Sequence, residues 1–453
     1  MKLEAFIIEN SSTVLEVLQK IESNQRGFVF LSDARLRIIG MCTDGDIRRR
    51  LMEGITVDEP ILSCINSSFV SATIDTPREL LLKQLDHKIK VIPVLDEMGR
   101  LVSIVTRDYW PEKQENKVFA RAKSPVRISF GGGGSDVSAY FDENRAAVIN
   151  STISLYSHAT MRLREDGKIS IRSLDLNDSV HFESIEELNT YSGKFSLIVS
   201  VIRSVNPPYG FDLHLYSDYP MSSGLGGSAV VSSAVLGCFN QFRNDQWDKY
   251  DIAEIAFHSE RLSLGIAGGW QDQYATVFGG FNFMEFNSEQ NIITPIRLSN
   301  SLKLDLEESL LLCYTGTTHD SGDIHVDQKE QTRSIHIKDR IKANVGLSYE
   351  MRDHLLRGRL DDFGRCIHRA WELKRGLSSK ISNSWIDGLY QGAIENGALG
   401  GKILGAGGGG FFLFYVRPFD RINLVNWLRS EGLTVTSFTF ENEGLQSWKV
   451  REI

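Results

Sequence analysis

The stretch PMSSGLGGSA, residues 220–229, is the most informative segment for the larger part of this chain. Residues 211–215 before it alternate apolar and polar side chains, as a half-buried strand does, and residues 229–242 after it suit a buried helix. The stretch therefore joins a strand to the start of a helix. Its glycines let the main chain approach a ligand closely, and the first N–H groups of a helix carry the positive end of its dipole. Together these features predict an anion site, most naturally for phosphate.

Three other interpretations of this stretch compete with a phosphate site. An ordinary glycine-rich turn with a serine as helix cap is one, because serine is a good N-cap residue. A Walker loop needs Gly-Lys-Ser or Gly-Lys-Thr, and the stretch has no lysine. Residues 224–229 fit the dinucleotide pattern G-x-G-x-x-A, but another helical segment follows instead of a strand that ends in an acidic residue. Only the capped turn stays open.

The composition sets broad limits on partners and compartment. A chain of 453 residues is too long for one core, and its formal net charge of -8 argues against nucleic acid or an anionic membrane as the main partner. The five cysteines are scattered without a C-x-x-C pair, so we expect neither a disulfide framework nor a zinc site. Residues 1–6 do not resemble a signal peptide and no long apolar run occurs, so we expect a cytoplasmic protein.

An internal repeat organises the first part of the chain. Residues 27–51 align with residues 90–110 at one constant offset, with an apolar strand, an acidic turn and a second strand in each. The aligned pairs are Asp33 with Asp96, Arg37 with Arg100 and Thr43 with Thr106. One structural unit is therefore used twice, and we expect a compact α/β unit in which each half covers the other's sheet.

With this repeat, residues 1–112 resemble a tandem CBS-domain pair, a regulatory or oligomerising module that often pairs with a second copy in a homodimer. GMCTDGD at 40–46 resembles the nucleotide-contacting motif of that family, which implies that Thr43 contacts a phosphate and Asp46 a ribose. The second repeat departs from the motif, since Ser103 and Tyr109 replace the usual glycine and acid. The alternative is that Thr43 only caps a helix. Residues 113–120 suit a linker.

A second glycine-rich loop lies before the phosphate loop. Four glycines, 131–134, follow an apolar strand at 123–130 and precede Ser135 and Asp136. Glycines leave the backbone free to bend around a ligand, and an aspartate just beyond them can accept hydrogen bonds from sugar hydroxyls. The alternative is a floppy surface turn.

Acidic residues after the phosphate loop suit phosphoryl transfer. Glu260 lies near the end of a helical pattern at 252–262, and Asp272 follows a glycine-rich turn. Transfer from a nucleotide needs a phosphate cradle, oxygen ligands for Mg²⁺ and a group that orients or deprotonates the acceptor hydroxyl. Ser228, Glu260 and Asp272 would supply the last two, unless Glu260 is solvent-facing and Asp272 is a helix cap.

A third glycine run, 405–410, leads into a buried strand at 411–416. Glycines beside a core strand indicate a close approach of the backbone, either to a ligand or to another backbone segment. Both readings stay open. Between the second and third loops, the sequence predicts a strand at 310–314, a turn at 315–322 and helices at 326–356, 360–375 and 382–395.

Taken together, the three loops resemble the three signature motifs of the GHMP kinases, and the likeness runs from about Arg121 to the last residue. The resemblance implies an α/β CBS pair followed by an α+β two-lobed kinase fold, with an ATP-binding lobe at 121–295 and a second lobe at 296–453. ATP phosphate binding is implied for Ser222, Ser223, Gly224, Gly226, Gly227 and Ser228.

The same resemblance implies the chemical roles. Mg²⁺ would be held by Ser228 and Glu260, and Asp272 would be the base on the acceptor hydroxyl. Arg127 would stabilise that carboxylate and the transferring phosphoryl group. The residues implied at the substrate are Gly133, Gly134, Asp136, Gly407, Gly408 and Lys374.

Within the family, RISFGGGGSD at 127–136 is similar to the bacterial heptose kinases, which phosphorylate D-glycero-D-manno-heptose 7-phosphate at O1 for nucleotide-sugar and surface polysaccharide synthesis. WELKRGLSSKISN at 371–383 points the same way, and Lys374 or Lys380 would meet the sugar phosphate. One departure is His319, where those kinases have arginine. The alternatives are another GHMP kinase, for L-fucose or galactose, and a non-catalytic nucleotide sensor.

Overall fold

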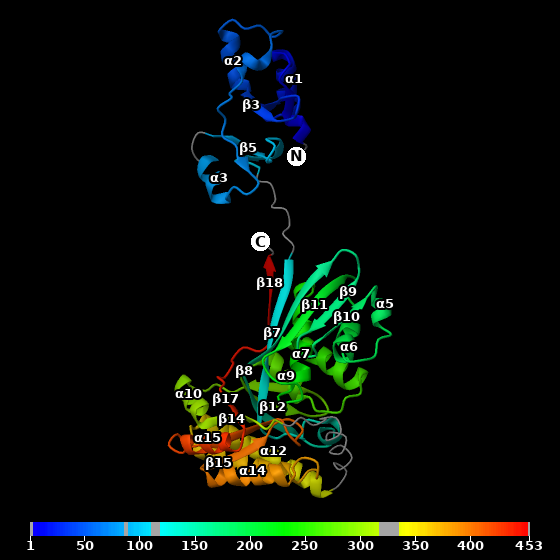
Figure 1. Ribbon diagram of the computed structural model, residues 1–453, viewed down its shortest axis with the longest axis vertical. Coiled ribbons are helices and arrows are strands. Elements are labelled where there is room, and N and C mark those ends of the chain that lie inside the picture. Colours follow the sequence, from blue (N-terminus) through cyan, green and yellow to red (C-terminus); the bar gives the residue numbers. More distant parts are fainter. Residues whose placement is uncertain (1–2, 86–88, 110–117, 317–334, 452–453) are drawn as a thin grey trace. The chain divides into compact units, whose positions relative to one another are not determined.

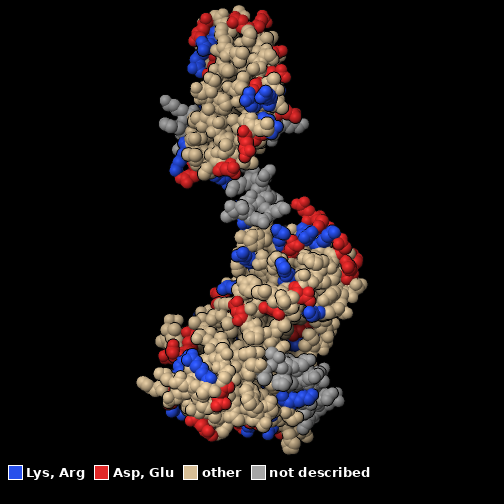
Figure 2. Space-filling model, viewed as in Figure 1, with Lys and Arg blue, Asp and Glu red and all other residues tan. Residues whose placement is uncertain are grey.

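The computed structural model describes residues 3–85, 89–109, 118–316 and 335–451. The chain divides into two compact units, Met1–Glu115 and Asn116–Ile453, and each is described by itself (Figure 1). Among the described residues, no helix is long and apolar enough to cross a membrane. On the face shown in Figure 2, acidic and basic side chains are interspersed on both units, so neither sign of charge gathers into one large patch there.

The first unit contains two three-stranded sheets of identical topology, each with a parallel pair followed by an antiparallel pair. The first sheet consists of β1 (Ile7–Glu9), β2 (Phe28–Ser32) and β3 (Ile38–Thr43). The second consists of β4 (Ala72–Thr73), β5 (Val91–Leu95) and β6 (Leu101–Thr106). The helices are α1 (Val14–Asn24), α2 (Asp44–Met52) and α3 (Arg78–Leu85), with short 3₁₀ turns at Leu3–Phe6 and Ile61–Cys64.

The two halves of this unit repeat even in their irregularities. Strand register is interrupted between Leu31 and Ser32 in one half and between Val94 and Leu95 in the other, at the same offset as the sequence repeat. Side chains of both halves also form one shared core, in which the Phe30 side chain and that of Ile104 are fully or almost fully buried. The expectation that each half covers the other's sheet is confirmed.

The second unit is built on an eight-stranded sheet with the path β10-β9-β11-β8-β12-β13, to which β7 adds by pairing with β8 and β18. Its strands are β7 (Val118–Gly131), β8 (Ala146–Arg164), β9 (Ile169–Ser173), β10 (Asp178–Phe182), β11 (Gly210–Ser217), β12 (Phe281–Phe286), β13 (Asn291–Pro295) and β18 (Gln446–Arg451). The helices that accompany this sheet are α4 (Ser138–Phe141), α5 (Ile185–Leu188), α6 (Ser196–Val205), α7 (Gly227–Gln241), α8 (Lys249–Phe257) and α9 (Gln271–Phe278).

Helix α7 is the central helix of this lobe. It is buried along most of its length and contacts β7, β8, α6, α8 and α9. Figure 1 shows it in green beside α9. Small residues allow this close approach: a Cβ at Gly237 would lie 3.2 Å from the Cβ of Ala122 on β7. The strand, glycine loop and buried helix predicted around residues 220–229 are all confirmed.

A second, antiparallel sheet with the order β15-β16-β14-β17 forms the other lobe. Its strands are β14 (Leu310–Tyr314), β15 (Ala398–Ile403), β16 (Phe411–Val416) and β17 (Thr434–Thr436). Its helices are α10 (Asn300–Ser309), α12 (Ile335–Leu356), α13 (Leu360–Lys374), α14 (Ser384–Glu395) and α15 (Arg421–Ser430). Of the predicted helix at 326–356 and turn at 315–322, residues 317–334 lie outside the described residues.

The last part of the chain leaves the second lobe, which was expected to span residues 296–453. After β17 the chain crosses back to the large sheet, where the Glu441 N–H donates to the Thr152 carbonyl over 3.0 Å. Strand β18 then pairs antiparallel with β7, with Trp448 opposite Arg121. The last residues therefore complete the sheet of the first lobe, which ties the two lobes together.

Candidate active site

The phosphate loop ends at a glycine, which is the N-cap residue of α7. Gly226 is the N-cap residue, with φ +78° and no side-chain capping bond, and Ser228 lies inside the first helical turn. The alternative of a turn capped by serine is therefore wrong. The first helical hydrogen bond from this turn runs from Val230 N–H to Gly226 O, over 3.2 Å. The N–H groups of residues 227–229 precede it at the positive end of the helix, as an anion site requires.

The third glycine loop packs directly on the phosphate loop. A Cβ at Gly405 would lie 2.5 Å from the Cα of Gly224, and a Cβ at Gly410 would lie 2.4 Å from the Ser223 carbonyl oxygen. That same carbonyl accepts a 3.0 Å hydrogen bond from Phe411 N–H. Of the two readings left open, approach of backbone to backbone holds at these positions, and the contact fixes the shape of the phosphate loop.

Glu260 lies in a single π-helical turn, His258–Ser263, at the end of α8. Its side chain is only 1% exposed, so the solvent-facing alternative is wrong. One carboxylate oxygen accepts a hydrogen bond from Ser228 Oγ and lies 3.1 Å from Arg261, and the other accepts from Gln273 Nε2 over 2.8 Å. The π turn thus directs a buried carboxylate at the first turn of α7.

Arg127 on β7 holds Asp272 in a two-point ion pair. Its Nε and one terminal nitrogen donate to the two carboxylate oxygens over 2.8 and 2.9 Å, and its other terminal nitrogen donates to the Gly224 carbonyl over 2.7 Å. The N-cap of α9 is Trp270, so Asp272 does not cap the helix. A Cβ at Gly226 would come within 3.3 Å of the Asp272 carboxylate, which places this pair directly against the phosphate loop.

Asp136 is buried behind the first glycine loop. Its carboxylate accepts hydrogen bonds from Gln271 N–H over 3.1 Å and from Gly134 N–H over 3.3 Å. Burial, and then the nearby charge of Asp272, raises the pKa of Asp136. Gly269 is required here, because a Cβ would lie 1.9 Å from the carboxylate oxygen.

The first glycine loop is held by α12. Asn344 accepts from Gly132 N–H over 3.2 Å and donates to the Gly133 carbonyl over 3.1 Å. Gly132 has φ +79°, and a Cβ there would lie 1.9 Å from the Ala147 carbonyl oxygen. The alternative of a floppy surface turn is therefore wrong.

A cavity brings these groups together with two buried lysines. It is lined by Arg127, Ser129, Gly133, Gly134, Asp136, Val137, Arg261, Gly269, Gln271, Asp272, Lys374, Leu377, Lys402 and Gly405. Lys374 donates to the carbonyls of Ile403 and Gly405 over 2.9 and 2.5 Å, and Lys402 donates to the Phe130 carbonyl over 3.3 Å. Burial, with charge repulsion from Arg127, lowers the pKa of Lys402 to about 7. Burial, followed by Lys402, lowers the pKa of Lys374 well below its ordinary value.

Some expected site residues lie apart from this cavity. Gly407 and Gly408 pack against Ile381, whose carbonyl accepts from Gly408 N–H over 2.8 Å, and neither lines the cavity. Lys380 is exposed. His319 lies outside the described residues.

Two cavity residues, Lys402 and Arg261, were missed in the sequence. Lys402 lies in the mostly buried strand β15. A lysine among small and apolar residues is the feature of the sequence that could have indicated its place in the cavity. Arg261 directly follows Glu260, and its Nε is buried without a hydrogen-bond partner among the described residues. A Cβ at Gly268 would lie 2.3 Å from the Arg261 guanidinium carbon, so that glycine makes room for the side chain.

In the first unit, Thr43 is the N-cap of α2. Asp46 N–H donates to Thr43 Oγ1 over 3.2 Å, and Thr43 N–H donates to the Asp46 carboxylate over 3.0 Å. This reciprocal capping box accounts for both residues without a ligand. A nucleotide at this site would have to contact groups that already bond to each other.

Comparisons with known proteins agree with this architecture. Residues 196–280 match the family model of the GHMP kinases N terminal domain, residues 351–427 match that of the GHMP kinases C terminal, and residues 62–109 match the CBS domain. The matched CBS segment is the second repeat, although the nucleotide motif was recognised in the first.

Among curated proteins, the D-glycero-alpha-D-manno-heptose 7-phosphate kinase of Campylobacter jejuni is 38% identical over 339 residues, which is 73% of this chain and 99% of that protein. The L-fucokinase/L-fucose-1-P guanylyltransferase of Bacteroides fragilis is 27% identical over 64% of this chain and 34% of its own length. Among solved structures, a D-glycero-D-manno-heptose 1-phosphate kinase from Bacteroides thetaiotaomicron has a TM-score of 0.62 at 29% identity, and covers 74% of this chain and 100% of its own.

Proposed function

The chain belongs to the GHMP kinase family, and on that premise we propose that it transfers the γ-phosphoryl group of ATP to the anomeric hydroxyl of D-glycero-D-manno-heptose 7-phosphate, giving the 1,7-bisphosphate. The observation that carries the proposal is the Arg127–Asp272 pair, which lies against the phosphate loop and lines the same cavity as Asp136. A base, a phosphate cradle and a polar cavity are thus adjacent.

Asp272 is the proposed base. Its carboxylate accepts the proton of the sugar O1 hydroxyl, whose oxygen then bonds to the γ-phosphorus while the bond from phosphorus to the β,γ-bridging oxygen of ATP breaks. The two-point pair with Arg127 keeps the carboxylate in one orientation, and the third bond of Arg127 ties that orientation to the phosphate loop. Fixed geometry of this kind is the main protein contribution to phosphoryl transfer.

Ser228 and Glu260 are suited to hold Mg²⁺. A hydroxyl and a buried carboxylate touch each other at the start of α7, and hard oxygen ligands of this type are those that Mg²⁺ prefers. Bound there with ATP, the ion would neutralise phosphate charge. Gln273 holds the far oxygen of Glu260, so the carboxylate keeps its direction toward α7.

The charges of the cavity support a phosphorylated sugar over a neutral one. Four basic side chains line it, Arg127, Arg261, Lys374 and Lys402, beside the carboxylates of Asp136 and Asp272. An anionic group on the substrate would favour the protonated form of the two lysines and pair with it. Asp136 would accept hydrogen bonds from sugar hydroxyls, and Gly133 and Gly134 allow the sugar close to the backbone.

The test is a panel of acceptors with MgATP: heptose 7-phosphate, heptose 1-phosphate, L-fucose, galactose and mevalonate. The Campylobacter jejuni relative is named a heptose 7-phosphate kinase, and the Bacteroides thetaiotaomicron structure a heptose 1-phosphate kinase. Both phosphate isomers therefore belong in the panel. We expect the highest kcat/KM on the 7-phosphate. Preference for a neutral sugar would favour the other GHMP kinase activities, and ATP binding without turnover of any acceptor would favour a nucleotide sensor.

The CBS pair is proposed as a regulatory module that binds a nucleotide at Thr43 and Asp46 and supports a homodimer. The family match supports a nucleotide ligand for this unit. The capping box means that binding must reorganise the start of α2, so nucleotide binding and the geometry of that helix are coupled.

A further inference from the structure

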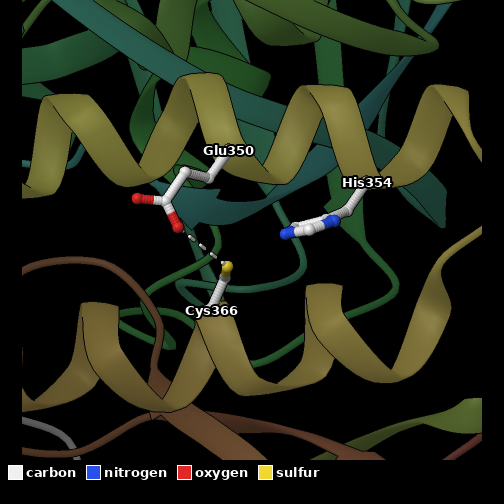
Figure 3. Close-up of side chains that lie close together, drawn as sticks. All are labelled: Glu350, His354 and Cys366. Carbon is white, nitrogen blue, oxygen red and sulfur yellow. Dashed lines mark hydrogen bonds between the residues drawn. The ribbon is translucent and has the colours of Figure 1, made fainter.

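Three potential metal ligands meet between α12 and α13, away from the cavity described above. Glu350 and His354 lie one helical turn apart on α12 and project toward Cys366 on α13 (Figure 3). One ligand atom from each residue lies within 4.8 Å of the other two, and the Cys366 sulfur is 3.8 Å from a Glu350 carboxylate oxygen. The cysteine is 2% exposed, while Glu350 lies at the surface, so the group reaches from the core to solvent.

We propose that Glu350, His354 and Cys366 bind one zinc ion, with water as the fourth ligand. Thiolate, imidazole and carboxylate are the three ligand types that zinc takes in proteins, and in a tetrahedral site their donor atoms are roughly 3.3–3.6 Å apart. The observed spread of up to 4.8 Å is wider than this, so the side chains must move closer together when the ion binds. The scattered cysteines predicted no zinc site, because the ligands of this one come from two helices and include only one cysteine.

A zinc ion would have to compete with a cation that is already present. It would balance the Cys366 thiolate and the Glu350 carboxylate, but Glu350 is paired with Arg369, whose guanidinium lies 2.6 Å away. The Arg369 side chain is 56% exposed, so it can turn into solvent when the metal takes its place. Because zinc binds the thiolate, binding displaces the Cys366 thiol proton to solvent.

The site would fasten the two helices that position the active-site loops. Helix α12 carries Asn344, which holds the first glycine loop, and α13 carries Lys374, which holds the third. A zinc ion between Glu350 and Cys366 joins these helices at a point that takes no part in the proposed chemistry. Its expected effect is on stability, and it does not depend on which sugar the enzyme uses.

The experiment uses the full-length protein, freed of metal with a chelator and titrated with Co²⁺ as a spectroscopic probe and then with Zn²⁺. We expect a thiolate-to-cobalt charge-transfer band, its displacement by one equivalent of zinc, and a rise in Tm of at least about 2 °C at saturating zinc. Cys366→Ala should abolish the band. His354→Ala and Glu350→Gln should weaken zinc binding by about 10–100-fold.

Matched variants make the result specific. His336→Ala, an exposed histidine on the same helix, and Glu372→Gln, an arginine-paired glutamate on α13, should leave the affinity unchanged. Arg369→Gln should increase it, because the competing partner of Glu350 is gone. Absence of the band in the wild-type protein, its survival in Cys366→Ala, or equal affinities for His354→Ala and His336→Ala would each overturn the proposal. If Cys366→Ala does not fold, the zinc affinities of His354→Ala and Glu350→Gln, compared with that of His336→Ala, decide whether the site exists.

Discussion

The guanidinium of Arg127 and the carboxylate of Asp272 form a two-point ion pair with bonds of 2.8 and 2.9 Å, although the residues are far apart in sequence. The remaining nitrogen of Arg127 holds the Gly224 carbonyl of the phosphate loop. One side chain thus sets the distance between the proposed base and the proposed ATP phosphates. Replacing each partner separately distinguishes the role of the base from that of the residue that positions it.

Replacing Asp272 with asparagine should leave ATP binding intact and lower kcat by about 10²–10⁴-fold, the usual effect of losing a general base. The amide keeps the size of the side chain but cannot accept the hydroxyl proton. Turnover is measured by ADP release and ATP affinity by calorimetry. A kcat within a few-fold of wild type would exclude Asp272 as the base.

Arg127→Lys should reduce kcat by about 10²-fold, because lysine keeps the charge but cannot make the two-point contact and the Gly224 bond together. The comparison is with Arg121→Lys, on the same strand but opposite Trp448 and outside the cavity, which should be neutral. If both variants behave alike, the positioning role assigned to Arg127 is wrong.

Glu260→Gln should raise the Mg²⁺ concentration needed for half-maximal activity by about 10–100-fold, with partial rescue at high Mg²⁺. The glutamine still fills the buried space and still contacts Ser228. Glu254→Gln, on an exposed part of α8, serves as the control. An unchanged Mg²⁺ dependence, in a variant with normal circular dichroism, would remove Glu260 from the metal site.

Stability should depend on pH through Lys402. Burial lowers the pKa of Lys402 to about 7, from 10.5 for an ordinary lysine, so between these values the unfolded chain binds more protons than the folded one. The free energy of unfolding contributed by this residue therefore rises with pH in that window and is lowest below pH 7. Lys402→Met should raise Tm most at pH 6 and progressively less toward pH 10. The exposed Lys380→Met should show no such trend, and a Lys402→Met effect that does not vary with pH would contradict the assignment.

Thr43→Ala should abolish AMP and CTP binding by the full-length protein while ATP binding at the phosphate loop is kept, and it should destabilise the first unit by about 0.5–2 kcal/mol through loss of the helix cap. The internal repeat provides the control: Thr106 accepts a 3.0 Å hydrogen bond from Tyr109 N–H in the equivalent turn, and Thr106→Ala should retain binding. Calorimetry with ATP, AMP and CTP measures nucleotide binding by both variants. Equal loss in the two variants, or no binding by wild type, would leave the module without the proposed site.

Much of this architecture was predictable because its signals are local. The loops at 131–136, 220–229 and 405–410 each combine glycines with a neighbouring strand or helix, and the repeat is visible as a constant offset. The needs of phosphoryl transfer pointed to Ser228, Glu260 and Asp272, and the family resemblance assigned the metal and base roles among them, which stay proposals. The alternative of a solvent-facing Glu260 stayed open in the sequence, because a π turn leaves no sequence signature.

What could not be predicted depends on contacts between distant segments. The contact of Gly405 with Gly224, the return of β18 to β7 and the cluster of Glu350, His354 and Cys366 are all set by tertiary packing. A glycine that meets a backbone looks the same in sequence as one that meets a ligand. For the same reason Gly407 and Gly408 were expected at the substrate, whereas they pack against Ile381.

The central claim is that the enzyme phosphorylates O1 of heptose 7-phosphate, and the most direct measurement is ³¹P NMR of the product formed with MgATP. Besides the signals of ADP, we predict one new sugar-phosphate resonance coupled to the anomeric proton, alongside the retained 7-phosphate signal, and its formation at least about 10²-fold more slowly with Asp272→Asn. A phosphate on any other oxygen, or no product from heptose 7-phosphate while another acceptor is turned over, would contradict the account.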